Sequence, residues 1–185
     1  MNTRLMVLTG IVVAAALSRL VPHPPNVTPI AAMALFGGAY VTNRKLAYLL
    51  PLAAMLLSDV VLGYTVYGAG VLTLQQPVVY LCILATAAMG RVIRDKRSAL
   101  DVGRVTLASS VLFYVVTNFA VWASGILYPM SWAGLAACYA AAIPFFRNSL
   151  VGDMGFAAVL FGGFALLEMH FTSLQENREA SFASR

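Results

Sequence analysis

Long runs of apolar residues, separated by short polar segments, make up most of the chain. A membrane span needs about 20 mainly apolar residues, so these runs are expected to form transmembrane helices. Six of them cover residues 5–20, 30–42, 46–62, 77–93, 105–126 and 150–171. A seventh run, 133–143, is short and ends at Pro144, which favours an outer or re-entrant helix over a complete crossing. The pattern predicts an all-α polytopic membrane protein with six transmembrane helices and this one extra short helix.

The composition supports a membrane protein with almost no soluble part. Of 185 residues, 61% are hydrophobic and 10% are charged, and the mean hydropathy is +0.83. Soluble domains carry about 25% charged residues. We therefore expect a single transmembrane domain over residues 1–172 and a polar cytoplasmic tail over 173–185. Cys82 and Cys138 lie in apolar surroundings without further ligands at metal-site spacing, so we predict no metal and no cofactor.

The basic residues lie in short loops and indicate the orientation of the helices. Because such loops stay in the cytoplasm, Arg44, Lys45 and the cluster from Arg91 to Arg104 are expected on that side. With six alternating spans, both termini also lie in the cytoplasm. The formal charge of +5 is divided among these loops, so it does not indicate nucleic-acid binding.

A stiff, polar connector follows the first span. Residues 19–29 contain four prolines, so a helix has to end near Leu20 and cannot restart before about Pro29. Arg19, His23 and Asn26 are polar groups held on this segment. A rigid, non-helical segment at the mouth of an apolar bundle suits a binding site. The alternative is a tight crossover loop without a ligand.

The topology brings further polar and aromatic residues to the outer end of the bundle, beside the connector. Ionisable groups at membrane depth are costly unless they are paired or face water. One interpretation is an outward-facing solute pocket, in which Arg19 and Arg147 face an anionic group and aromatic rings face a flat ring. The other is a set of ion pairs, Arg19–Asp59 or Arg147–Asp153, that join helices. The predicted substrate-binding residues are Arg19, His23, Asn26, Asp59, Asn118, Trp122, Tyr128, Arg147 and Asp153.

Small residues suggest where helices approach each other closely. Gly10, Ala14 and Ser18 are spaced by four on the first span, so they form one stripe for packing inside the bundle or for docking a partner protein. The adjacent Gly37 and Gly38 likewise permit close backbone contact. The chain has no serine-nucleophile motif, no glycine-rich phosphate loop and no zinc-type cluster, so we expect no enzyme and assign no catalytic residue.

Several of these segments resemble motifs of an uncharacterised bacterial integral membrane family that is grouped with the substrate-binding S components of energy-coupling-factor (ECF) vitamin transporters. The segments are SRLVPHPPNVTP at 18–29, ALFGGAY at 34–40, LSD at 57–59, TNFAVW at 117–122, YP at 128–129 and IPFFRNSLVGD at 143–153. The resemblance implies a six-helix S-component-like fold in the bacterial inner membrane, with an outer solute site capped by the first inter-helix loop. It also implies docking through the first helix onto a membrane coupling protein with two cytoplasmic ATPases, although some members act alone.

These observations lead to two hypotheses about function. In the first, the protein captures a small organic micronutrient, a vitamin or its precursor, at the outer face of the membrane and helps it across. Any ATP-driven step would then need partners, because the chain contains no ATPase motif. In the second, the protein is a membrane assembly or structural factor that docks another membrane protein through its small-residue helix faces. A cavity of ligand size at the outer cluster would favour the first hypothesis.

Overall fold

The computed structural model describes residues 3–22, 24–67 and 75–175, and within them every regular element is helical. Six helices carry the fold, and short π-helical and 3₁₀ turns extend or join them. The helices are α1 (Thr3–Ser18), α2 (Ile30–Tyr40), α3 (Arg44–Leu62), α4 (Gln76–Val92), α5 (Ala99–Ala123) and α6 (Trp132–Ala157). The turn η1 (Gly63–Tyr67) extends α3, and η2 (Ala158–Gly162) joins α6 to α7 (Gly163–His170), after which η3 (Thr172–Leu174) follows. The all-α prediction is confirmed.

Polar residues define where three of the helices begin. Asn43, Ser98 and Ser131 precede α3, α5 and α6, and each side chain accepts a hydrogen bond of 3.1 Å from the backbone N–H three residues later. Such bonds satisfy a backbone donor that has no partner inside the helix. The connector between α1 and α2 ends at Pro29, and α2 starts at the next residue.

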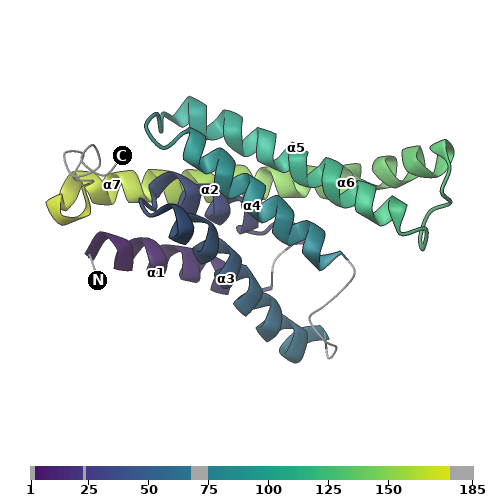
Figure 1. The fold of residues 1–185 in the computed structure, drawn as a ribbon, viewed down its shortest axis with the longest axis horizontal. Coiled ribbons are helices and arrows are strands. Elements are labelled where there is room, and N and C mark those ends of the chain that lie inside the picture. The colour runs from purple at the N-terminus through teal and green to yellow at the C-terminus, as the bar shows by residue number, and fades with distance from the viewer. Residues whose placement is uncertain (1–2, 23, 68–74, 176–185) are drawn as a thin grey trace.

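The sequence prediction was wrong about residues 133–143. They are not a separate outer or re-entrant helix, because α6 continues through Pro144 and the helical run extends over 39 residues from Trp132 to His170. Pro144 is exposed within this helix and has no backbone N–H, so the hydrogen bond to the carbonyl oxygen of residue 140 cannot form. At 1.5 Å per residue the run is about 58 Å long, roughly twice the thickness of a hydrocarbon core. Its first part runs beside α5 (Figure 1).

Three helical segments are long and apolar enough to cross a membrane. They are Arg44–Thr65, Ala99–Ala123 and Trp132–His170. The other apolar helices, α1, α2 and α4, have between 10 and 17 residues. The membrane character of the chain is therefore supported by these three segments, and the count of six spans stays a prediction.

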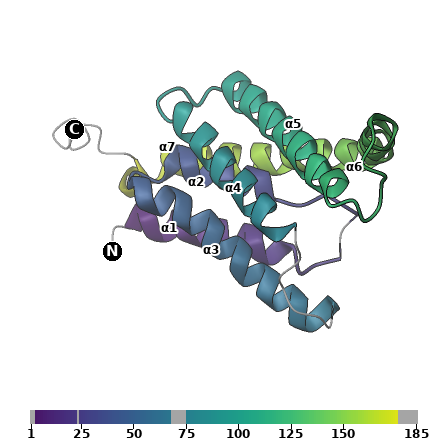
Figure 2. The same ribbon diagram turned by 45° about the vertical axis from the view of Figure 1, so that its right-hand side comes forward.

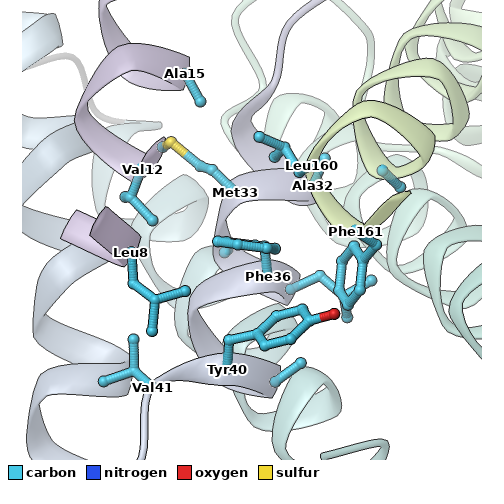
Figure 3. Packing of buried hydrophobic residues seen from close by; sticks show 14 of the residues in the cluster. Leu8, Val12, Ala15, Ala32, Met33, Phe36, Tyr40, Val41, Leu160 and Phe161 are labelled. Atoms are coloured by element: carbon cyan, nitrogen blue, oxygen red, sulfur yellow. The ribbon is translucent and has the colours of Figure 1, made fainter. Parts of the chain in front are cut away.

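Helix α2 lies in the middle of the molecule. Helices α5 and α6 lie on one side of α2 and α4, and α1 and α3 lie on the other (Figure 2). Every residue of α2 after Ile30 is buried. Phe36 and Tyr40 pack against the rings of Phe161 and Phe164, with ring centroids 4.7 to 5.6 Å apart (Figure 3 shows the first three). This uniformly apolar helix is the core around which the others are arranged.

Helices α2 and α4 cross at backbone contact. A Cβ atom built on Gly38 would lie 2.0 Å from the carbonyl oxygen of Ala87, and one built on Gly90 would lie 2.2 Å from that of Leu35. No side chain fits at either position without moving a backbone. Glycine at these two sites therefore sets the distance between the two helices.

Arginines gather at the carboxyl end of α2. Arg91 and Arg94 donate to the carbonyl oxygen of Val41, at 3.3 and 3.0 Å, and Arg97 donates to that of Ala39 at 3.4 Å. Cations are favourable there because the last carbonyls of a helix lack partners inside it and carry its negative dipole end. The prolyl connector leads into the other end of α2, about 16 Å away for an 11-residue helix. The cluster of arginines and the prolyl connector thus lie at opposite ends of the bundle.

The amino-terminal helix is fastened to the end of the chain at the arginine end. Arg4 is buried, pairs with Glu168 at 2.9 Å and donates to the carbonyl oxygen of Leu174 at 2.7 Å. Leu174 itself is buried. The predicted tail 173–185 therefore begins with residues packed on the bundle, and its residues 176–185 lie outside the described part of the chain.

Candidate functional site

The first polar cluster joins the start of the connector, directly after α1, to α3. Nη1 of Arg19 lies 2.8 Å from Oδ1 of Asp59, and the two side chains are 11% and 7% exposed. Arg19 also donates a hydrogen bond to the hydroxyl of Ser58, and its Nη1 lies 2.9 Å from Sδ of Met55. The guanidinium is therefore enclosed by groups of α3.

The same carboxylate is bound from α4. Oδ2 of Asp59 accepts a hydrogen bond from the amide of Gln76 and another, of 3.1 Å, from the hydroxyl of Tyr80. Both oxygens are thus engaged, by Arg19 at the start of the connector and by groups of α4. This is the arrangement in which an ion pair joins helices, the second interpretation of the polar cluster.

A cavity of about 300 Å³ lies beside this cluster, between the connector and helices α2, α4, α5 and α6. Such a volume is at the lower end of the range for small-molecule sites. Polar and aromatic side chains share its wall. The lining residues are Asn26, Thr28, Ile30, Ala31, Val79, Ser110, Phe113, Tyr114, Thr117, Asn118, Ala142, Phe145, Phe146, Ser149 and Asp153.

Helices α5 and α6 each contribute one regular stripe to the wall. The α5 residues are 110, 113, 114, 117 and 118, and the α6 residues are 142, 145, 146, 149 and 153. Spacings of three and four residues place side chains on one face of a helix. The two helices pack along each other, so their stripes face the same space.

Asp153 is the acidic residue among the lining residues of the cavity. It is 6% exposed, and its Oδ2 accepts a hydrogen bond of 2.7 Å from the hydroxyl of Ser110. Among the described lining residues there is no lysine, arginine or histidine. The cavity therefore presents a buried carboxylate within hydroxyl, amide and aromatic groups.

The connector contacts α6 beside the cavity. Asn148 donates to the carbonyl oxygen of Pro25 at 3.2 Å, and a Cβ atom on Gly152 would lie 3.1 Å from Cα of Val27. Asn26 has φ of 62°, a left-handed conformation that asparagine tolerates better than most residues. Because Asn26 is exposed and Asp153 is buried, the cavity extends from the surface of the connector to the carboxylate.

Comparison with known families assigns the chain to a group. A family model described as a family of unknown function (DUF6580) matches residues 1–175. The chain belongs to DUF6580. No curated protein and no solved structure matches it.

The structure distributes the predicted binding residues of this DUF6580 member over several places. Asn26, Asn118 and Asp153 line the cavity, whereas Arg19 and Asp59 form the ion pair described above. His23 lies outside the described residues. The remaining three do not line the cavity: Trp122, Tyr128 and Arg147.

Local contacts explain why those three residues lie elsewhere. Trp122 donates through Nε1 to the carbonyl oxygen of Pro129 at 3.1 Å, which closes the turn between α5 and α6 where Tyr128 also lies. Arg147 is exposed on α6, and within the described residues it makes no ion pair with Asp153. The alternative of an Arg147–Asp153 pair is therefore wrong.

The aromatic wall was missed by the sequence interpretation. It consists of Phe113, Tyr114, Phe145 and Phe146, and not of Trp122 and Tyr128. Tyr114 lies 4.8 Å from the Phe146 ring and donates to the carbonyl oxygen of Tyr139 at 2.8 Å. The helical spacing of these residues was the available signal. On α6 this signal was lost because the chain was divided at Pro144, which separated Ala142 from the rest of its stripe.

The predicted docking stripe in this DUF6580 protein lies away from the core of the bundle. Gly10 and Ala14 are exposed, and no atom lies within 4 Å of a Cβ built on Gly10. Ser18 is half-buried and donates to the carbonyl oxygen of Ala15 at 2.7 Å. Buried Leu8, Val12, Ala15 and Ala16 form the inner face of α1 instead. Gly10 and Ala14 are thus not needed to pack α1 inside the chain.

Proposed function

We propose that this protein binds a small organic solute in the cavity between the connector, α2, α4, α5 and α6 and takes part in carrying it across the membrane. The observation that carries the proposal is the cavity itself, about 300 Å³ with a buried carboxylate and aromatic walls. Apolar pockets with a few convergent polar groups are typical of small-molecule sites. A micronutrient such as a vitamin or its precursor has the size and mixed polarity that fit this wall.

The placement of charges supports capture from outside the cell. The arginines at the carboxyl end of α2 belong in the cytoplasm under the positive-inside rule, and the connector leads into the opposite end of that helix. The exposed Asn26 then lies at an outward-facing mouth. With no phosphate-binding motif in the chain, energy for transport would come from a partner or from the solute gradient. We propose a binding and translocation role and no enzymatic one.

Native mass spectrometry of gently purified protein tests this proposal. We expect a small molecule to be retained by the wild type and lost from Ala142→Trp, because Ala142 is buried and lines the cavity that the larger side chain would fill. The matched control is Ala136→Trp on the exposed face of the same helix, which should retain the molecule. Equal retention in both variants, or a wild type that neither retains a molecule nor is stabilised by any fraction of a metabolite extract, would contradict the proposal.

A second candidate is an assembly or structural factor, and the exposed small residues of α1 favour it. Gly10 and Ala14 leave a smooth face on which another transmembrane helix could pack closely. Co-purification from cross-linked membranes separates the two candidates. A stoichiometric membrane partner without a bound small molecule supports the assembly role. A bound molecule that depends on Ala142 supports the transport role, with or without such a partner.

A further inference from the structure

The charge of the cavity wall indicates which solutes it would accept. Resting on the proposed function, we propose that the solute is a cation with hydrogen-bond donors on a flat ring, such as an amine-bearing, amidine-bearing or protonated heterocyclic compound, and that Asp153 is its counter-charge.

Four acidic residues lie within the three helical segments long enough to cross a membrane: Asp59, Asp101, Asp153 and Glu168. Asp101 is half-buried in the first turn of α5, where the hydroxyl of Ser98 donates to it. Of the other three acids, two have a cation in place. Asp59 pairs with Arg19 at 2.8 Å, and Glu168 pairs with Arg4 at 2.9 Å. Asp153 is as buried as Asp59, at 6% against 7% exposed, yet its hydrogen-bond partner among the described residues is the neutral hydroxyl of Ser110.

A carboxylate taken out of water without an opposite charge is strongly unfavourable. The fold supplies that charge to the other two acids from an arginine of α1 or of the segment that follows it. At Asp153 it supplies a cavity instead, which is where an external cation would lie. Ser110 binds one carboxylate oxygen, and a donor pair on the solute could bind the carboxylate further in the manner of an amidinium or guanidinium group.

The remaining wall suits the ring of such a solute. Phe113, Tyr114, Phe145 and Phe146 line the cavity, and aromatic rings attract cations as well as flat rings. Polar atoms for ring substituents come from Thr117, Asn118 and Ser149.

An anionic solute does not fit this wall. No described lining residue is basic, Arg19 is already paired, and Arg147 is exposed outside the cavity. From the sequence we expected Arg19 and Arg147 to bind an anionic group of the solute. The cavity wall instead favours a cationic solute.

Three probes of nearly equal shape test the preference: benzamidinium, benzamide and benzoate, which are cationic, neutral and anionic. Their binding to purified protein in lipid nanodiscs is measured by isothermal titration calorimetry and by the change in Tm that each probe causes. We expect benzamidinium to bind at least about tenfold more tightly than benzamide, and benzoate to bind most weakly. Asp153→Asn, which keeps the size of the side chain, should remove the advantage of benzamidinium. Asp101→Asn is the control. Asp101 lies in the first turn of α5, whereas Thr117 and Asn118 of the cavity lie near the other end of that helix, so this change should leave the tighter binding of benzamidinium unchanged.

The outcomes separate this inference from the proposed function. If benzamide or benzoate binds as tightly as benzamidinium, and Ala142→Trp abolishes that binding, the cavity is a solute site but the cationic preference is refuted. If Asp153→Asn keeps the preference, the assignment of Asp153 is refuted. If no probe binds the wild type, the inference fails, and native mass spectrometry then decides the proposed function independently. Should Asp153→Asn not fold, the order of the three probes on the wild type still decides the sign of the preference.

Discussion

The ion pair between Arg19 and Asp59 offers the sharpest test of how the connector end is held together. We consider Arg19→Met, Asp59→Leu and the double variant, which form a double-mutant cycle. The pair links α1 to α3, while the second oxygen of Asp59 is bound from α4. Each single change therefore leaves a buried group without its main partner, and the double change removes both charges.

The size of the effect follows from burial and geometry. The two side chains are 11% and 7% exposed and their charged atoms are 2.8 Å apart. Removing one member of such a buried pair costs about 3 to 5 kcal/mol, whereas replacing both members with apolar groups is often close to neutral. For a chain of this length, 3 kcal/mol corresponds to a decrease in Tm of roughly 6 to 12 °C. The double variant should thus be more stable than either single variant.

Thermal unfolding in lipid nanodiscs, followed by tryptophan fluorescence, measures the cycle. Arg147→Met is the matched control, because this arginine is exposed on α6 and forms no ion pair within the described residues. Its Tm should stay within about 2 °C of the wild type. A double variant that loses as much stability as the two single variants together would show that the two charges do not stabilise each other. Single variants with wild-type Tm would refute the proposed link between the helices.

Three further predictions follow from the contacts described above. Gly38→Ala should lower the free energy of unfolding by about 1 to 3 kcal/mol or more, because its Cβ would overlap a carbonyl oxygen of α4, whereas Gly10→Ala should not be destabilising; chemical unfolding compares them. Ala14→Leu should keep the Tm and solute binding but abolish co-purification of a membrane partner, and unchanged co-purification would refute docking there. Arg4→Gln should cost about 3 kcal/mol by leaving Glu168 without its cation, and adding Glu168→Gln should restore part of the loss in the same unfolding measurement.

The positions of most helices could be predicted from the sequence because their ends carry local signals. Pro29 ends the connector just before α2, and Asn43 caps α3 close to the start of the apolar run 46–62. The start of α5 was placed too late, because Ser98 caps this helix and it begins six residues before the apolar run 105–126. The close contact of α2 with another helix was also indicated by Gly38. The sequence did not indicate that α4 is the partner helix in this contact. The approach of Gly38 to Ala87 depends on how segments distant in the sequence pack together.

The main error, at Pro144, propagated from the fold into the site. A proline inside an apolar run usually ends a helix in soluble proteins, but apolar surroundings can preserve a helix through it. Dividing the run there placed Ala142 and Asp153 on separate elements. The continuous helix places them eleven residues apart on one face, with Phe145, Phe146 and Ser149 between them. Asn26, Asn118 and Asp153 were still identified because polar residues in apolar surroundings are conspicuous without any structure.

Helix α4 contacts both the Arg19–Asp59 ion pair and the cavity. This shared contact decides how substitutions at Asp59 should be interpreted. Tyr80 donates to Asp59, while its neighbour Val79 lines the cavity. The ion-pair cluster therefore positions one wall of the site without contacting the solute. Asp59→Asn should accordingly weaken benzamidinium, benzamide and benzoate by a similar factor, because a displaced wall does not discriminate between charges. Asp153→Asn should act on benzamidinium selectively, because it removes the counter-charge itself. A selective loss of benzamidinium in Asp59→Asn would instead place the Arg19–Asp59 pair within the solute site.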